Sequence, residues 1–303
     1  MASSPSAFKV YAEECHSIFG NAPTLELLIE NHEYPFAHEA GVYVAQDNTH
    51  FVTSNQFVDP SVGRRHIRIS KICLPVDLAS KAVGCEEIDA PMVPMANGGV
   101  NDRDGILFCA QGTLSAPGGL VWMDAKPPYT CSSPITSFHG LNDVVVHSDG
   151  GIWFTDPIYG FEQGIRPKPR LPSQVCRFDP DTGPDEEIVY ITDTDWIHGD
   201  GTTDDARVSH IYAFDVATYS GQPFLTSRRL FTMADKGVPD GINGCGDSVS
   251  IWSPGGVLLG KILVDGGVAN FCFGVNGELF LLNENRIWRA QLSSGIKGDL
   301  LRI

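Results

Sequence analysis

The sequence predicts an all-β fold, a six-bladed β-propeller in which one or two blades are shortened. Among its 303 residues, 32 glycines and 20 prolines are typical of many short strands joined by tight turns. Residues 141–157 have the pattern of a β-hairpin, and a related pattern recurs along the chain. With 42% hydrophobic residues a substantial core can form, so we expect a single domain over residues 1–303, with an N-terminal extension of about 30 residues.

The hairpin in residues 141–157 is predicted from its residue types. Three consecutive valines are followed by Asp-Gly-Gly and then by Ile-Trp-Phe. β-Branched and aromatic residues favour strands, whereas Asp and Gly tolerate the positive φ of a tight hairpin turn. Asn142 and Asp143 therefore stand where the first strand begins, and this carboxamide and carboxylate are the first place to look for chemistry.

A recurrent unit organises the chain. It consists of an Asp or Asn turn, an aromatic residue, a small or apolar residue and a polar residue, and its five copies have their aromatic residues at Phe51, Phe108, Trp153, Tyr190 and Phe280. The interval before the last copy has room for one more. Six units of a few tens of residues are the sequence signature of a propeller with four-stranded blades. A β-sandwich with coincidental similarity is the alternative.

Other segments are read from their local patterns. Residues 174–178 and 209–214 alternate in the manner of strands, and we predict that they are third strands of blades. Only two short segments, 24–30 and 77–83, carry any helical suggestion.

Charge and cysteine usage narrow the possible partners. The formal net charge is −16 and only 21 residues are Lys or Arg, so a nucleic-acid partner is not expected. No apolar run is long enough to span a bilayer, the N-terminus does not have the pattern of a signal peptide, and eight cysteines lack metal-site or disulfide spacing. We expect a cytoplasmic protein without a membrane partner, a monomer or a weak homo-oligomer that binds a small molecule.

Taken together, these motifs resemble the SMP-30/gluconolactonase/LRE-like family, especially its fungal lactonohydrolase-like members. The stretches that carry the resemblance are LNDVVVHSDGGIWFTDP at 141–157, HEAGVY at 38–43, VYITDT at 189–194, HIYAFD at 210–215, VPDGI at 238–242 and NFCFG at 270–274. The resemblance implies a six-bladed propeller with a divalent cation, usually Ca²⁺, at the top of the central channel. It also implies an enzyme that hydrolyses a sugar lactone or another small lactone, and thus a carboxylic ester hydrolase.

The resemblance further implies a metal site made of Glu39, Asn142 and Asp240. Ca²⁺ takes six to eight oxygen ligands, including carboxylates and Asn carbonyls, so these residue types suit it, and Zn²⁺ or Mn²⁺ are the alternatives. Asp240 is also our candidate for the catalytic general base. The simpler interpretations are a loop carboxylate for Glu39, a strand cap for Asn142 and a turn residue for Asp240. For Asp143 we favour a structural role.

The sequence departs from the family pattern in three places, one of them a shortening at 138–141, where the family commonly has several more residues before the Asn. Before residue 188 the family has an inner strand with a Pro-Asn-Gly motif whose Asn binds the metal, and nothing at 179–187 matches it. Residues 240–247 compress an inner strand and its hairpin partner into a few positions. The alternative function is therefore a catalytically impaired propeller that binds a ligand or a partner protein, and a strictosidine-synthase-like propeller is a further possibility. Loops at 97–102 and 159–172 are expected to form the pocket walls.

Overall fold

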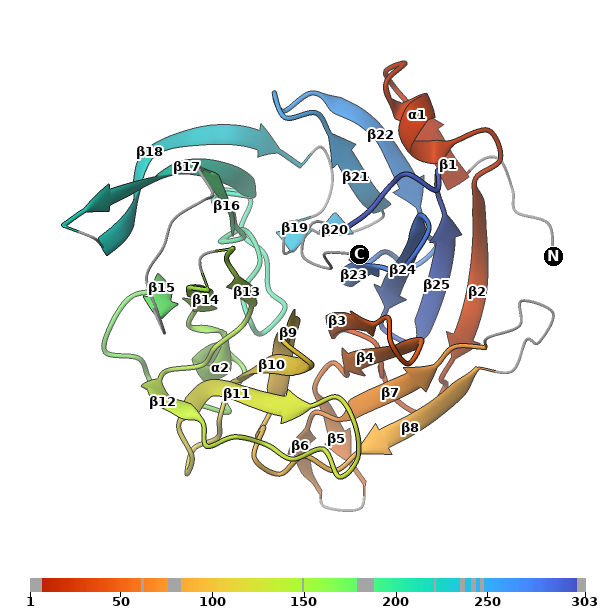
Figure 1. The fold of residues 1–303 in the computed structure, drawn as a ribbon. Helices are drawn as coiled ribbons and strands as arrows, with labels where there is room; N and C mark the ends of the chain where they lie inside the picture. Colours follow the sequence, from red (N-terminus) through yellow and green to blue (C-terminus); the bar gives the residue numbers. More distant parts are fainter. Residues whose placement is uncertain are drawn as a thin grey trace.

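The computed structural model describes residues 7–60, 63–75, 83–148, 150–178, 188–220, 222–234, 238–240, 244–245 and 248–298. Within these residues, six sheets of three to five strands are set around a common centre, and a two-stranded hairpin lies beside them (Figure 1). Two short helices are present, α1 (Cys15–Phe19) and α2 (Tyr159–Glu162). No helix in the described parts is long and apolar enough to cross a membrane. The predicted all-β, propeller-like architecture is confirmed.

Each sheet runs from an inner strand near the centre to an outer strand. The first two are β3 (Glu39–Val44), β4 (Thr49–Thr53), β7 (Ile69–Cys73) and β8 (Gly84–Ile88), then β9 (Ala96–Asp102), β10 (Gly105–Ala110), β11 (Gly118–Asp124) and β12 (Ile135–Phe138). The next two have three strands each: β13 (Val144–Val146), β14 (Ile152–Asp156) and β15 (Gln174–Phe178), then β16 (Ile188–Asp193), β17 (His210–Tyr219) and β18 (Gln222–Met233).

The last two sheets each take in a strand from the N-terminal part of the chain. They are β19 (Pro239–Asp240), β20 (Gly244–Cys245), β21 (Ser248–Trp252), β22 (Leu258–Leu263) and β1 (Phe8–Val10), then β23 (Asn270–Phe273), β24 (Glu278–Asn283), β25 (Arg286–Gln291) and β2 (Thr24–Glu30). The separate hairpin is β5 (Phe57–Asp59) with β6 (Arg64–His66). Inner strands of neighbouring sheets touch, because β3 contacts both β9 and β23, and β9 contacts β13.

The recurrent unit marks the second strands. The hairpin predicted at 141–157 is β13 paired with β14, with Val144 opposite Phe154, and residues 174–178 form β15 beside it as predicted. The aromatic residues of the copies in β4, β10, β14 and β24 are at most 5% exposed. These strands have a neighbour on each edge, so their side chains fill the space between adjacent sheets.

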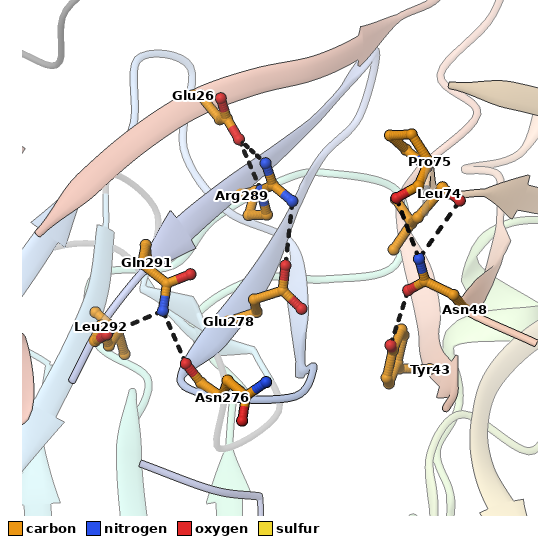
Figure 2. Close-up of polar contacts among 10 residues, drawn as sticks. All are labelled: Glu26, Tyr43, Asn48, Leu74, Pro75, Asn276, Glu278, Arg289, Gln291 and Leu292. Carbon is orange, nitrogen blue, oxygen red and sulfur yellow. Dashed lines mark hydrogen bonds and ion pairs between the residues drawn. The ribbon is translucent and has the colours of Figure 1, made fainter. Parts of the chain in front are cut away.

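Residues 24–30 form a strand, not the short helix that their local pattern suggested. Strand β2 pairs with β25 from Thr24 opposite Gln291 to Glu30 opposite Arg286. Figure 2 shows Arg289 of β25 between two carboxylates, those of Glu26 in β2 and of Glu278 in β24. Cross-strand pairing and opposite charges outweigh a weak helical propensity, which is a local quantity. Of the second suggested helix, 77–83, residues 77–82 lie outside the described residues.

Side chains also hold the turns at the ends of strands. In the turn after β3, Asn48 has a φ of +50°, and its carboxamide accepts a hydrogen bond from the Tyr43 hydroxyl at 2.9 Å (Figure 2). Its amide group donates to the carbonyl oxygens of Leu74 and Pro75, both at 3.4 Å. Asn tolerates this left-handed conformation better than most residues, so Asn48 combines turn formation with anchoring of the segment that follows β7.

The sheet formed by β16, β17 and β18 is incomplete on its inner side. The recurrent unit aligns β16 with β14, yet in the described residues no strand pairs with the edge of β16 that corresponds to the β13 side of β14. Second strands elsewhere are largely buried, whereas no residue of β16 is buried and Ile188 is 42% exposed. None of the four hydrophobic clusters formed by the described residues includes a residue of this sheet. The predicted shortening before this strand falls on 179–187, which lie outside the described residues, so it stays a prediction.

The second predicted compression, at 240–247, lies largely outside the described residues. Within them, β19 and β20 have two residues each. They nevertheless pair with each other, Asp240 lying opposite Gly244, and β20 continues the sheet through Cys245 to Ser248 of β21. These short strands thus still place Asp240 at the inner end of its sheet.

Acid sensitivity of the fold should depend on His50 of β4. This imidazole is fully buried, lies 2.9 Å from the Cys272 sulfur, and burial lowers its pKa to about 3. Below pH 6.5 this histidine is therefore protonated in the unfolded chain but stays neutral in the folded protein. The free energy of unfolding should fall by about 1.4 kcal/mol per pH unit between about pH 6 and pH 3. Urea unfolding at several pH values should show a shallower acid dependence for His50→Gln.

The matched control is His32→Gln, because the His32 side chain is 82% exposed. This variant should keep the acid dependence of the original protein. Equal slopes for His50→Gln and the original protein would contradict the assignment of a neutral, buried imidazole.

Candidate functional site

Polar residues gather where the inner strands begin. Glu39 and Asn270 are the first residues of β3 and β23, Asn97 is the second residue of β9, and Asn142 precedes β13 by two positions. Asp240 lies in β19. Neighbouring inner strands touch around the centre, and they bring Asn270 to Glu39, and Gly98, next to Asn97, to the Asn142 carbonyl.

Glu39 is a buried carboxylate with one hydrogen-bond donor from the neighbouring sheet. It is 5% exposed, and Nδ2 of Asn270 donates to its Oε2 at 2.5 Å. Burial raises the pKa of Glu39 well above its ordinary value, and the nearby Asp240 and Asp143 carboxylates raise it further. His38 and the Asn270 hydrogen bond act in the opposite direction. The structure therefore brings two of the three predicted metal ligands, Glu39 and Asp240, into one electrostatic environment.

Asp143 also belongs to this environment. The structural role predicted for it is present, because its carboxylate accepts a hydrogen bond from the backbone N–H of Val144 at 2.8 Å at the start of β13. However, burial raises the pKa of Asp143 to about 6, and the Asp240 carboxylate contributes to the rise. Asp143 is thus a third acid of the site, and its position beside Asn142 in the hairpin motif is the signal that could have indicated it.

Asn142 is held at the site by its backbone. Its carbonyl oxygen accepts a hydrogen bond from the N–H of Gly98 at 2.8 Å, and its own N–H donates to the Thr155 carbonyl at 3.1 Å. A Cβ atom at position 98 would lie 2.5 Å from that Asn142 oxygen and 2.7 Å from Oδ1 of Asp143. Only glycine at position 98 allows β9 to pass so close to Asn142 and Asp143. The role of the Asn142 side chain as a metal ligand stays a prediction.

A histidine supplies positive charge beside the acids. Nδ1 of His38 lies 2.8 Å from Oε1 of Glu284. Burial opposes the charged form, but this contact and the carboxylates of Glu284, Glu39 and Asp240 outweigh it and raise the pKa of His38 to about 9. At neutral pH the imidazolium therefore offsets part of the negative charge at the channel end.

The segment 158–166, which contains α2, ties several loops together near the site. Tyr159 and Thr194 share a hydroxyl–hydroxyl hydrogen bond of 2.5 Å, and Glu162 accepts from the N–H of Gly199 at 2.6 Å. Burial raises the pKa of Tyr159 to about 12, and Asp240 is among the nearby charges that contribute. Tyr159 is therefore close enough to Asp240 to be affected by its charge, and the role of 159–172 as a pocket wall stays a prediction.

The same segment is anchored by a buried arginine. The guanidinium group of Arg166 donates to four backbone carbonyl groups, those of Thr113, Ala116, Phe138 and His139. Arg65 of β6 donates to the Gln163 carbonyl at 2.5 Å, so the segment is held at both of its ends. By contrast, the other expected wall loop, 97–102, is not a loop: it belongs to β9, because it pairs with β10 from Asn101 opposite Ile106 to Gly99 opposite Phe108.

The residues that could hold a cation are oxygen donors. In the described parts of the chain, no group of three His, Cys, Asp or Glu side chains is close enough to hold a metal ion. A cation here would need a carboxamide, a carbonyl or water beside the carboxylates, which is the ligand mixture that Ca²⁺ accepts.

Comparisons with known proteins agree with this picture. No protein-family model matches the chain. Lactonohydrolase oryL from Aspergillus oryzae (strain ATCC 42149 / RIB 40) is 24% identical over 324 residues, which cover 87% of this chain and 69% of that protein. This similarity is consistent with an SMP-30/gluconolactonase-like protein. The resemblance predicted from the motifs is confirmed.

Solved structures show the same fold. A gluconolactonase from Xanthomonas campestris superposes with a TM-score of 0.68 at 22% identity, covering 96% of this chain and 97% of that one. A second protein, assigned to the gluconolactonases, superposes with a TM-score of 0.66 at 17% identity, covering 94% of this chain and 97% of its own. At these identities the likeness shows a propeller-like fold and leaves the chemistry to the residues of this chain.

The close pass of β9 can be tested with Gly98→Ala. The added methyl group would overlap the Asn142 carbonyl oxygen, so we expect a loss of about 1–3 kcal/mol in the free energy of unfolding, measured by urea denaturation. Gly84→Ala is the control, because a Cβ atom there meets only Cβ of Cys73 at an ordinary 3.5 Å. Equal stability of the two variants would show that Gly98 is not required at this contact.

Proposed function

We propose that this protein is a lactonase that hydrolyses a small lactone with the help of a divalent cation, Ca²⁺ being the first candidate, on a six-bladed propeller. The observation that carries the proposal is the gathering of Glu39, Asp143 and Asp240 at one end of the channel. The relatives named lactonohydrolase and gluconolactonase support lactone hydrolysis. They favour an enzyme over the alternative of an impaired propeller that only binds a ligand.

The residues present fit a divalent cation. Three carboxylic acids share a buried region, where each raises the cost of ionising the next. In addition, Oδ1 of Asn97 on the neighbouring strand is buried without a hydrogen-bond partner. Both features are those of a site that a hard cation completes. We propose Glu39, Asn142 and Asp240 as ligands.

The reaction follows from these groups. A bound divalent cation supplies polarisation of the lactone carbonyl. Asp240 takes a proton from a water molecule as the water oxygen bonds to the carbonyl carbon, and the ring C–O bond then breaks. The proton held by Asp240 passes to the departing ring oxygen, which gives the hydroxy acid. We propose that Tyr159, whose pKa is raised in part by the Asp240 carboxylate, orients the substrate through its hydroxyl group.

Replacement of the proposed base should abolish most of the activity. For Asp240→Asn we expect kcat to fall about 10²- to 10⁴-fold, because the amide cannot accept the proton from water. Acid release from D-glucono-1,5-lactone with added Ca²⁺, followed with a pH indicator, measures this loss. Asp47→Asn is the control, because the Asp47 carboxylate pairs with Lys126 at 3.5 Å in the turn after β3, away from the proposed site. Full activity in Asp240→Asn would sink the assignment of the base.

Removal of the Tyr159 hydroxyl group tests whether this residue contacts the substrate. Tyr159→Phe deletes a hydrogen-bonding group beside Asp240, so KM should rise about 3- to 10-fold while kcat stays within about twofold. Tyr129→Phe is the matched control, since the Tyr129 hydroxyl is buried without a partner in the described structure and lies in a core cluster between other sheets. If Tyr159→Phe changes only the melting temperature, Tyr159 is a structural residue and does not contact the substrate.

A further inference from the structure

We propose that Asn97 is a ligand of the cation at this site, through its side-chain oxygen Oδ1. The inference rests on the proposed function, because it concerns the cation proposed there. It assigns to β9 a contribution that the motif-based ligand set, Glu39, Asn142 and Asp240, does not contain.

The position of Asn97 is fixed from both sides. Its backbone carbonyl accepts a hydrogen bond from the hydroxyl group of Thr53 at 3.0 Å, and Thr53 pairs directly with Glu39. The next residue, Gly98, donates its N–H to the Asn142 carbonyl. Asn97 therefore lies between two of the proposed ligands, on the strand that separates them.

The side chain of Asn97 has an unmet acceptor. Oδ1 is buried and has no hydrogen-bond partner, and it is the only carboxamide oxygen in that condition among the described residues. A buried carbonyl without a partner costs about 1–3 kcal/mol, and such atoms are rare. A cation bonded to Oδ1 removes this cost, and amide carbonyl oxygens are ordinary Ca²⁺ ligands.

Space for one small species exists beside Asn97. A cavity of about 20 Å³ is lined by Asn97 together with His38, Gln111 and other residues, and by none of Glu39, Asn142 and Asp240. A volume of this size holds one water molecule. A water molecule in this cavity is therefore the competing partner for Oδ1 that an experiment must separate from the cation.

The incomplete sheet gives a reason for an additional ligand. In the described residues no strand pairs with the inner edge of β16, so no ligand from that sheet is described. Glu39, Asn142 and Asp240 alone leave a cation that needs six to eight oxygens dependent on water for the rest. Asn97 adds a protein oxygen from a strand that is intact and well buried.

Calorimetry with CaCl₂ on chelator-treated protein tests this assignment without any measurement of activity. Relative to the original protein, Asn97→Ala should bind Ca²⁺ at least about 10-fold more weakly. Asn97→Asp should still bind Ca²⁺, because its carboxylate keeps an oxygen at the position of Oδ1. The control is Asn101→Ala, four residues further along β9, whose side chain donates to the Tyr43 carbonyl at 2.8 Å. It should lose stability and keep its Ca²⁺ affinity within about twofold.

The outcomes are distinct. If the original protein binds Ca²⁺ and Asn97→Ala binds it equally well, the ligand assignment is overturned, a water molecule satisfies Oδ1, and the proposed function stands. If the original protein binds neither Ca²⁺, Mn²⁺ nor Zn²⁺, the proposed cation itself is wrong and the assignment falls with it. If Asn97→Ala fails to fold, Asn97→Ser replaces it. The serine side chain is too short for its oxygen to reach the cation, so this variant should show the same loss of Ca²⁺ affinity.

Discussion

The pairing of β2 with β25 is the constraint on which the rest of the structure depends. The last sheet takes its outer strand from the N-terminal part of the chain, and the chain then continues from β2 into β3 of the first sheet. The junction between first and last sheets is also where the Asn270–Glu39 and His38–Glu284 contacts are made. Closure of the ring and assembly of the site are therefore one event, because the chain cannot place Glu39 beside Asn270 without joining its two ends.

The site concentrates negative charge in a protein that is already acidic. The Asp240 carboxylate makes ionisation of both Glu39 and Asp143 harder, and Asp143 adds to the effect on Glu39. His38 supplies a single compensating cation, held by Glu284. This balance suits a neutral substrate better than an anionic one, because an added anion would meet the field of three acids.

Much of the fold could be predicted because its signals are local. The hairpin of β13 and β14 is encoded by valines, a Gly-rich turn and aromatic residues within 17 positions, 141–157, and the recurrent unit marks the second strands in the same way. Strand β2 was missed because its partner β25 lies more than 250 positions away and its own residues carry only weak preferences. For Asp143 only the structural role was predicted, because the chemistry of a strand start can be recognised in a sequence. Its proximity to Asp240 cannot be recognised there. Asn97 has no motif at all and is distinguished only by its environment.

The sheet of β16, β17 and β18 differs from the other sheets in its apolar packing. In the described residues, four clusters of buried apolar side chains join the other sheets to one another, and none of them includes a residue of this sheet. The contacts described on its side of the ring include polar ones to α2, such as Tyr159 with Thr194 and Glu162 with Gly199. An apolar cluster separates only at a large cost in free energy. Loss of the α2 contacts should therefore leave intact the packing around Glu39, Asn97 and Asn270.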